Sequence, residues 1–154
     1  MGDRVYTMPI DSVTFGTAAS DIFTLMGLTV NGIVLHHIHL EANVTAEAAL
    51  RFRLKRLTAT AVTGSGGAAG TPVPCDPLDA AVVGTYRIGD TAQATGGATN
   101  ILAGFYWDVA LPFDHLPAPE DRERCSVLSA LVLENSAVIV STVISGYVKF
   151  ALVP

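Results

Sequence analysis

The sequence predicts an all-β protein: an antiparallel β-sandwich or jelly roll of about eight strands, joined by long loops rich in glycine and proline. Three observations predict this fold. Short apolar segments are separated by glycine and proline, one segment alternates apolar and basic residues with period two, and no long helical pattern is present. Neither an internal repeat nor a shift in composition divides the chain, so we expect a single domain over residues 1–154.

The expected strands are apolar or β-branched segments with turn residues between them. They are residues 4–8, 22–25, 33–42, 50–56, 81–88, 101–110, 127–133 and 137–153. Asn31-Gly32, a dipeptide typical of tight turns, leads into residues 33–42, which we expect to form a central strand. The last segment is long enough for a hairpin that turns near Ser145 and Gly146.

Residues 50–56 have the most regular pattern. Leu50, Phe52 and Leu54 alternate with basic residues, which is typical of a half-buried strand. Good helix formers at residues 45–49 make a helix the competing interpretation. We favour the strand, with a turn or a single helical turn at residues 43–48.

Two long loops lack a strand pattern, and residues 1–12, despite the expected strand at residues 4–8, have too little pattern to pack as core. Residues 63–80 are rich in glycine and proline, which predicts a long loop with no regular ladder, and such loops are commonly functional or interfacial. Residues 111–122 form a second loop, rich in proline and then in charge. We expect residues 1–12 and 63–80 to act as arms that reach a neighbouring protein.

The composition excludes several classes of protein. The chain is 50% hydrophobic and only 15% charged, against about 25% charged in a typical soluble domain. Its net charge of -5 argues against nucleic-acid binding, and no apolar run approaches the roughly 20 residues that span a bilayer. The first residues lack a signal-peptide pattern, so we expect no export. Cys75 and Cys125 have no CxxC spacing and are expected to be free thiols.

The most distinctive cluster is His36-His37-Ile38-His39-Leu40-Glu41. On a strand, His37, His39 and Glu41 share one face, and His-x-His can hold zinc or iron, as in cupin-like jelly rolls. The third histidine of such a site would have to be His115, which lies in the second loop. The alternative is that His37 and His39 lie on the wetter face at a subunit contact, while Val34, His36, Ile38 and Leu40 face the other way.

Other candidate motifs have structural interpretations that we favour. Gly64–Gly70 lacks the spacing of a phosphate-binding loop and is expected to be flexible. Asp76 and Asp79 are explained by turn formation. The basic residues of the fourth expected strand predict a solvated face or a docking strip for an acidic partner; they are Arg51, Arg53, Lys55 and Arg56.

Aromatic residues occur together in the 101–110 segment. Alternation there puts Phe105 and Trp107 in the core and Tyr106 on the opposite face. No catalytic motif occurs anywhere in the chain, so we predict neither enzymatic activity nor a cofactor, and assign no catalytic or metal residues.

The order of segments resembles a family of small proteins encoded in the structural-gene clusters of tailed phages and prophages. The similarity covers roughly residues 4–150 and includes the strands "LHHIHL" and "LRFRLKR". Its most specific parts are the Gly-Ser-Gly-Gly to Thr-Pro-x-Pro-x-Asp-Pro loop at residues 64–77 and the Leu-Pro-x-Pro-Glu stretch at residues 116–120. The strand at "LHHIHL" takes part in the resemblance by its place in the order of segments, whereas its histidines are not part of the family pattern.

The resemblance implies a virion-associated structural role. The leading expectation is a capsid decoration, or cement, protein that binds the major capsid protein at the capsid surface as a homotrimer. A tail, baseplate or receptor-binding β domain is the first alternative, and a cupin-like metal-binding protein using His37 and His39 is the second. We expect no direct contact with nucleic acid or membrane.

Overall fold

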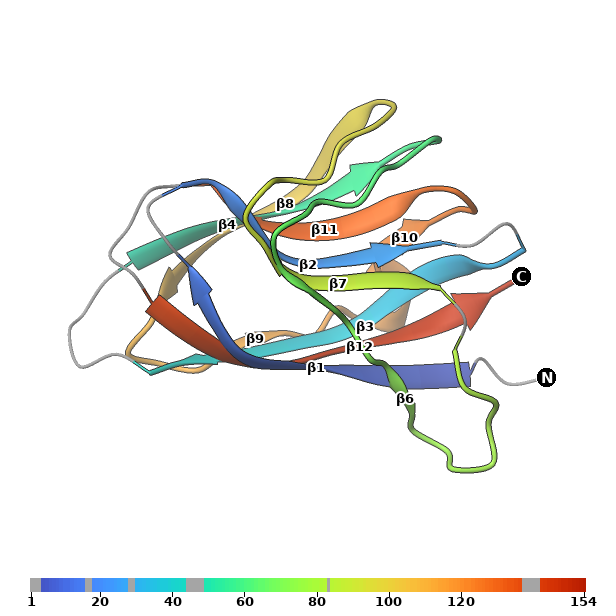
Figure 1. Ribbon diagram of the computed structural model, residues 1–154. Coiled ribbons are helices and arrows are strands. Elements are labelled where there is room, and N and C mark those ends of the chain that lie inside the picture. The colour runs from blue at the N-terminus through green and yellow to red at the C-terminus, as the bar shows by residue number, and fades with distance from the viewer. Residues whose placement is uncertain (1–3, 16–17, 28–29, 44–48, 83, 137–141) are drawn as a thin grey trace.

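A computed structural model describes residues 4–15, 18–27, 30–43, 49–82, 84–136 and 142–154 (Figure 1). Two antiparallel sheets pack against each other, which confirms the predicted all-β sandwich. Within the described ranges the helical structure is a single 3-10 turn at Pro119–Asp121. No helix in the described part of the chain has the length and apolar character needed to cross a membrane.

The first sheet is built around β3, which lies next to β12, and β12 lies next to β1. Short strands extend this sheet: β6 pairs with β1, and β9 and β10 pair with β3. The strands are β1 (Arg4–Phe15), β3 (Gly32–Ala42), β6 (Val73–Pro74), β9 (Phe113–His115), β10 (Arg124–Cys125) and β12 (Thr142–Val153).

The second sheet has the order β5-β7-β2-β11-β4-β8. Its strands are β2 (Ser20–Met26), β4 (Ala49–Leu57), β5 (Ala68–Ala69), β7 (Thr85–Asp90), β8 (Thr99–Asp108) and β11 (Ala130–Asn135). Without β5, β6, β7 and β10, the two sheets read β1-β12-β3-β9 and β2-β11-β4-β8. Counted in chain order, the first of these eight strands pairs with the eighth (β1 with β12) and the second with the seventh (β2 with β11). The third pairs with the sixth (β3 with β9) and the fourth with the fifth (β4 with β8), which is the pairing of an eight-stranded jelly roll.

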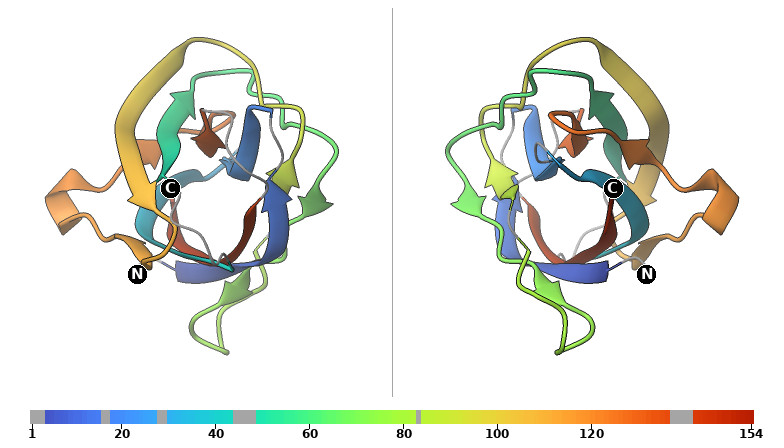
Figure 2. Two further views of the ribbon diagram at one scale, coloured as in Figure 1. Left: turned by 90° about the vertical axis from the view of Figure 1, so that its left-hand side faces the viewer. Right: turned by 90° about the vertical axis from the view of Figure 1, so that its right-hand side faces the viewer.

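The core lies between the two sheets, and Figure 2 shows the strands surrounding it. Alternate residues of each strand point inward, as the period of a pleated strand requires. The large side chains that are fully buried there include Tyr6, Phe23, Phe52, Phe150, Met8, Ile10, Ile38 and Leu40. Strand alternation therefore places the histidines beside Ile38 and Leu40 on the outer face of the first sheet.

The expected N-terminal arm at residues 1–12 is wrong where the structure describes it. Residues 4–12 belong to β1, whose register runs alongside β12 for almost its whole length. Tyr6, Met8 and Ile10 are buried core residues, so β1 cannot detach without exposing the core. Residues 1–3 of the expected arm lie outside the described residues.

The expected loop at residues 63–80 is in part a connection between the sheets. Ala68–Ala69 pairs with β7 in the second sheet, and Val73–Pro74 pairs with β1 in the first, so the expectation of no ladder is wrong at these two points. Residues 75–82, which we call the projecting loop, then extend from the body of the protein (Figure 2) and return to it at Val82, which packs against the core. The second loop also contains a strand, β9.

Several expected strand limits differ from the structure. The 81–88 strand is β7, which begins at Thr85, and the 127–133 strand is β11, which begins at Ala130 after a turn. The expected hairpin near Ser145 and Gly146 is wrong, because β12 runs through both residues without turning. Residues 44–48, where a turn was expected, and residues 137–141 of the last expected strand lie outside the described residues.

Gly146 lets β12 pass close to β3. Its φ is +153°, and a Cβ at this position would lie 2.0 Å from the His39 carbonyl oxygen. We expect Gly146→Ala to lower the free energy of unfolding by about 1–3 kcal/mol, because the neighbouring backbone must move. Urea denaturation measures this loss. Gly104→Ala is the matched control, since no atom lies within 4 Å of its added Cβ; equal stability of the two variants would contradict the close approach.

Candidate functional site

His37 and His39 are positioned by the pleat of β3. Ile38 and Leu40 are fully buried in the core, so the two histidines point to the outer face and are only half-buried. This confirms the wetter-face interpretation for both imidazoles. The predicted inward set is wrong in one respect: His37 pairs with Lys149 and Leu35 with Phe150, which leaves His36 as the extra residue of a β-bulge.

The bulge changes the face on which the preceding residues lie. Leu35, rather than Val34 or His36, belongs to the core cluster together with Ile38 and Leu40. A two-residue repeat cannot show such an insertion, because the bulge depends on the register with β12.

The third member of the site is Asp114, which the sequence analysis did not single out. The short strand β9 pairs with β3 so that Asp114 lies opposite His39. Phe113 and His115 alternate to the other face, where each ring centroid is within 5.2 Å of the Phe105 ring. His115 Nε2 is 2.9 Å from Glu123 Oε1, so the expected third ligand lies apart from the cluster.

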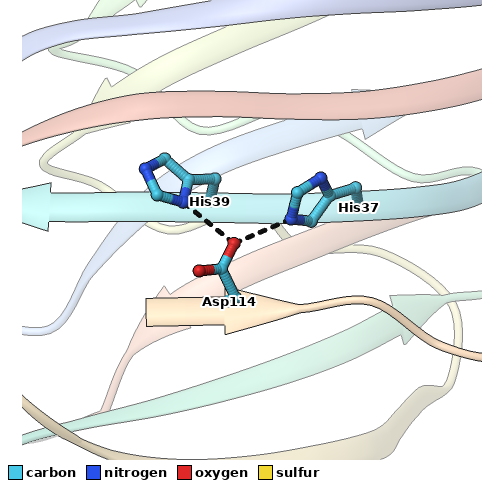
Figure 3. A group of neighbouring side chains, drawn as sticks. All are labelled: His37, His39 and Asp114. Atoms are coloured by element: carbon cyan, nitrogen blue, oxygen red, sulfur yellow. Dashed lines mark hydrogen bonds and ion pairs between the residues drawn. The ribbon is translucent and has the colours of Figure 1, made fainter. Parts of the chain in front are cut away.

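The Asp114 carboxylate lies between the two imidazoles (Figure 3). Its Oδ1 atom is 2.8 Å from His37 Nε2 and 2.9 Å from His39 Nδ1. His39 Nε2 is in turn 3.3 Å from Glu41 Oε1, and the hydroxyl of Tyr147 is 3.4 Å from His37 Nδ1. Both rings therefore have a polar partner at each nitrogen.

These contacts shift the pKa values of His39 and Asp114. His39 donates to a carboxylate from both nitrogens only as the imidazolium, and the hydrogen bond to Asp114 raises the pKa of His39 above its usual value. The same bond, followed by the bond from His37, lowers the pKa of Asp114. His37 has Asp114 at its Nε2 and the Tyr147 hydroxyl at its Nδ1.

Tyr147 packs beside both histidines. Its ring stacks on His39 with centroids 5.2 Å apart and meets His37 edge-on at 5.3 Å. The register of β12 with β3 produces this packing, since Tyr147 lies opposite His39 and Lys149 opposite His37. The cluster is thus held by three neighbouring strands, β9, β3 and β12, on an open sheet face.

Neither cleft described in the structure is lined by these histidines. One lies beside Glu41 and Val109–Pro112, and the other lies between Arg56, Arg124 and the C-terminal end of β12. The cupin-like alternative would require His37 and His39 to line a pocket, and the structure places them on an outer surface instead.

The expected solvated face of basic residues is wrong at Lys55. This side chain is 5% exposed, and its Nζ lies 2.6 Å from Glu134 Oε2 and 3.9 Å from Asp21 Oδ1. Residues 58–66 and 91–98 cover this part of the second sheet, with bridges at Val62–Thr95 and Ser65–Ala92. The local pattern of a strand cannot show that segments distant in the chain will bury one of its side chains.

The other members of the basic strip also have partners within the chain. Arg53 forms an ion pair with Glu134, and Arg56 donates to the Arg124 carbonyl. Arg51 lies over the ring of Tyr106, which is 79% exposed as expected, and Trp107 is buried as expected. Two of the four basic residues, Arg53 and Lys55, therefore face carboxylates of the chain itself, whereas Arg51 and Arg56 have no acidic partner in these contacts.

The cysteines and Asp76 follow their structural interpretations, whereas the expected flexibility of Gly64–Gly70 is not borne out, since this segment pairs with β7 and bridges to Ala92. Cys75 and Cys125 are both free, as predicted; burial raises the pKa of the Cys125 thiol to about 11. The amide of Gly67 donates to Asp90, so the glycine-rich segment uses a carboxylate of its own chain where a phosphate loop would hold an anion. Asp76 forms the predicted turn, with Oδ1 accepting from the Leu78 amide.

In comparisons with known proteins, no family model, no curated protein and no solved structure matches the chain. The jelly-roll fold occurs in viral capsid domains, in lectins and in cupins, so the fold alone leaves several functional classes open.

Proposed function

We propose that this chain is a capsid decoration, or cement, protein of a tailed phage that binds the assembled head shell as a trimer. The proposal rests on the resemblance over residues 4–150 and on one structural feature, the projecting loop. Its mechanism is binding alone. A protein that binds only the assembled shell stabilises that shell by mass action, and no catalytic group is required.

The projecting loop presents a fully solvated apolar tip. Leu78 is 95% exposed, and it lies in a turn closed by hydrogen bonds from the Leu78 and Asp79 amides to Asp76. A leucine held in water at the end of a loop gains nothing for the folded monomer. It can gain about 1.5–3 kcal/mol when a partner buries it.

The base of the projecting loop is fixed to the body of the protein. The Cys75 amide donates to the Val5 carbonyl, and the Tyr6 hydroxyl donates to the Ala80 carbonyl. Arg4 Nε forms an ion pair with Asp79 Oδ1 at 3.6 Å. These contacts join the loop to β1, a strand whose side chains Tyr6, Met8 and Ile10 are buried in the core. A loop that is already ordered loses little conformational entropy on binding, which favours its use as an anchor in a partner's pocket.

Leu78→Asp tests the proposal. We expect this variant to fold normally and to bind heads lacking the protein roughly 10- to 100-fold more weakly, because burial of the leucine is lost. Co-sedimentation of the purified chain with such heads measures the affinity. Leu116→Asp is the matched control, as Leu116 is 70% exposed on a different loop. If the native protein and Leu78→Asp bound these heads with equal affinity, the projecting loop would not be part of the interface.

The location of the chain in the virion tests the wider proposal. An electron cryomicroscopy map of the intact particle should show it on the outside of the head shell, around local three-fold positions. Density at the tail or baseplate would instead support the receptor-binding alternative and would exclude the cement role.

A further inference from the structure

We propose that His37, His39 and Asp114 form a binding site for one divalent transition-metal ion of the zinc class on the outer face of the first sheet. The site is independent of the assembly role proposed above. It requires one ion per chain, with His37 Nε2, His39 Nδ1 and Asp114 Oδ1 as ligand atoms.

The three atoms are already close to a metal-binding arrangement. They all lie within 4.8 Å of one another, and Asp114 Oδ1 is 2.8 and 2.9 Å from the two nitrogens. Zinc binds nitrogen and oxygen at about 2.0–2.2 Å, so tetrahedral ligand atoms are roughly 3.3–3.6 Å apart. The Asp114 side chain is 54% exposed and free to retreat by the roughly half ångström that this requires.

The outer contacts of the two imidazoles match those of metal ligands. A ligating histidine donates the N–H of its other nitrogen to a carboxylate or another acceptor, which fixes its tautomer and its orientation. His39 has Glu41 Oε1 at its Nε2, and His37 has the Tyr147 hydroxyl oxygen at its Nδ1. In each ring the nitrogen facing Asp114 is therefore the one left for an ion.

The strands hold the ligands in place before any ion binds. His37 and His39 lie two residues apart on β3, between Asp114 on β9 and Tyr147 on β12. Tyr147 packs against both rings, so their rotation is restricted. An ion would also cross-link β9, a strand of only three residues, to the middle of the sheet.

The ligand types define the class of ion. Two imidazoles suit Zn²⁺, Ni²⁺ or Co²⁺, whereas Mg²⁺ and Ca²⁺ prefer sets made of oxygen. Three protein ligands leave a coordination position for water or for a group from another molecule. We therefore expect selective binding of Zn²⁺ over Mg²⁺.

Calorimetric titration of the tag-free, chelator-treated full chain with ZnCl₂ tests the site. We expect one Zn²⁺ per chain, no heat of binding with MgCl₂, and a visible absorption band of low-symmetry Co²⁺ when CoCl₂ replaces zinc. His37→Ala and Asp114→Asn should each weaken Zn²⁺ binding by more than the roughly 10- to 100-fold typical of a lost outer partner. Tyr147→Phe, which keeps the stacked ring, should weaken it by about tenfold.

His115→Ala is the matched control, because it removes an imidazole from β9, the strand of Asp114, but from outside the cluster. It should bind Zn²⁺ like the native chain. Circular dichroism establishes that each variant is folded, and Asp114→Asn keeps the test usable should His37→Ala unfold. Absence of stoichiometric Zn²⁺ binding, equal binding by Asp114→Asn, or loss of binding in His115→Ala would each overturn the assignment.

Discussion

Replacing Lys55 by methionine is expected to lower the free energy of unfolding by about 3–5 kcal/mol at neutral pH. Lys55 is buried with two carboxylates, since its Nζ lies 2.6 Å from Glu134 and 3.9 Å from Asp21. Methionine has a similar length but no charge, so Asp21 would remain buried without its lysine and Glu134 would keep Arg53 alone as its ion-pair partner. Removal of one partner from a buried ion pair costs far more than the pair itself contributes.

The neighbours of Lys55 limit how far the site can adjust. Gln93 donates to Glu134 Oε2, and the Ala94 amide donates to Asp21 Oδ2 at 2.5 Å, so the covering segment is hydrogen-bonded to both acids. Loss of the ammonium should loosen this cover as well as the sheet beneath it.

Urea denaturation at pH 7 measures the effect of Lys55→Met. Lys149→Met is the matched control, because Lys149 is the other lysine of the chain and lies half-exposed over the Tyr147 ring. We expect the control to change stability by about 0.5 kcal/mol or less. If the two variants lost similar amounts of free energy of unfolding, the charge of Lys55 would not be needed to stabilise the buried carboxylates.

Asp21 should make the protein less stable as the pH rises from about 4 to about 6. Burial, the largest cause, raises the pKa of Asp21 from 3.8 to about 6, with Glu134 and Asp90 adding to the increase; the Ala94 amide and Lys55 oppose it. Between these two pH values the folded state holds a proton that the unfolded state has released. The contribution of Asp21 to stability is therefore greatest below pH 4, falls through this window and is constant above it.

Asp21→Asn isolates this contribution. Because asparagine does not ionise, the stability of the variant relative to the native chain should increase between pH 4 and pH 6, by up to about 3 kcal/mol. Denaturation curves of both proteins at several pH values measure the difference. Asp11→Asn, on an exposed side chain, is the control and should show no such trend. A difference that stays constant from pH 4 to pH 7 would mean that Asp21 ionises normally in the fold.

Local patterns were enough to predict the strands whose packing is simple. The alternation of Leu50, Phe52 and Leu54 identified β4, and the apolar run after Asn31-Gly32 identified β3, because one face of each strand is buried in the core. The same reasoning underestimated β1, where Tyr6, Met8 and Ile10 alternate but Pro9 and Asp11 interrupt the apolar pattern. Pro9 is tolerated within this strand of the sheet.

The candidate site was predictable only in part. The spacing of His37 and His39 requires that they share a strand face, whereas Asp114 comes from a segment between Pro112 and Pro117 that has no strand pattern of its own. Three residues carry too little periodicity to be identified as a strand. Their pairing with β3 is a long-range contact, and it depends on the packing of the whole second loop.

The sequence by itself determined the class of fold and the pair of histidines, because both follow from the two-residue period of a strand. The tertiary structure decided which charges are buried and which third residue completes the site. From the sequence, Lys55 is expected to be solvated and Asp114 to be an acid in a loop. In the structure, Lys55 is a buried ion-pair partner and Asp114 lies between two imidazoles. Both outcomes come from segments far apart in the chain, whose meeting is determined by sheet register and by the burial of apolar surface.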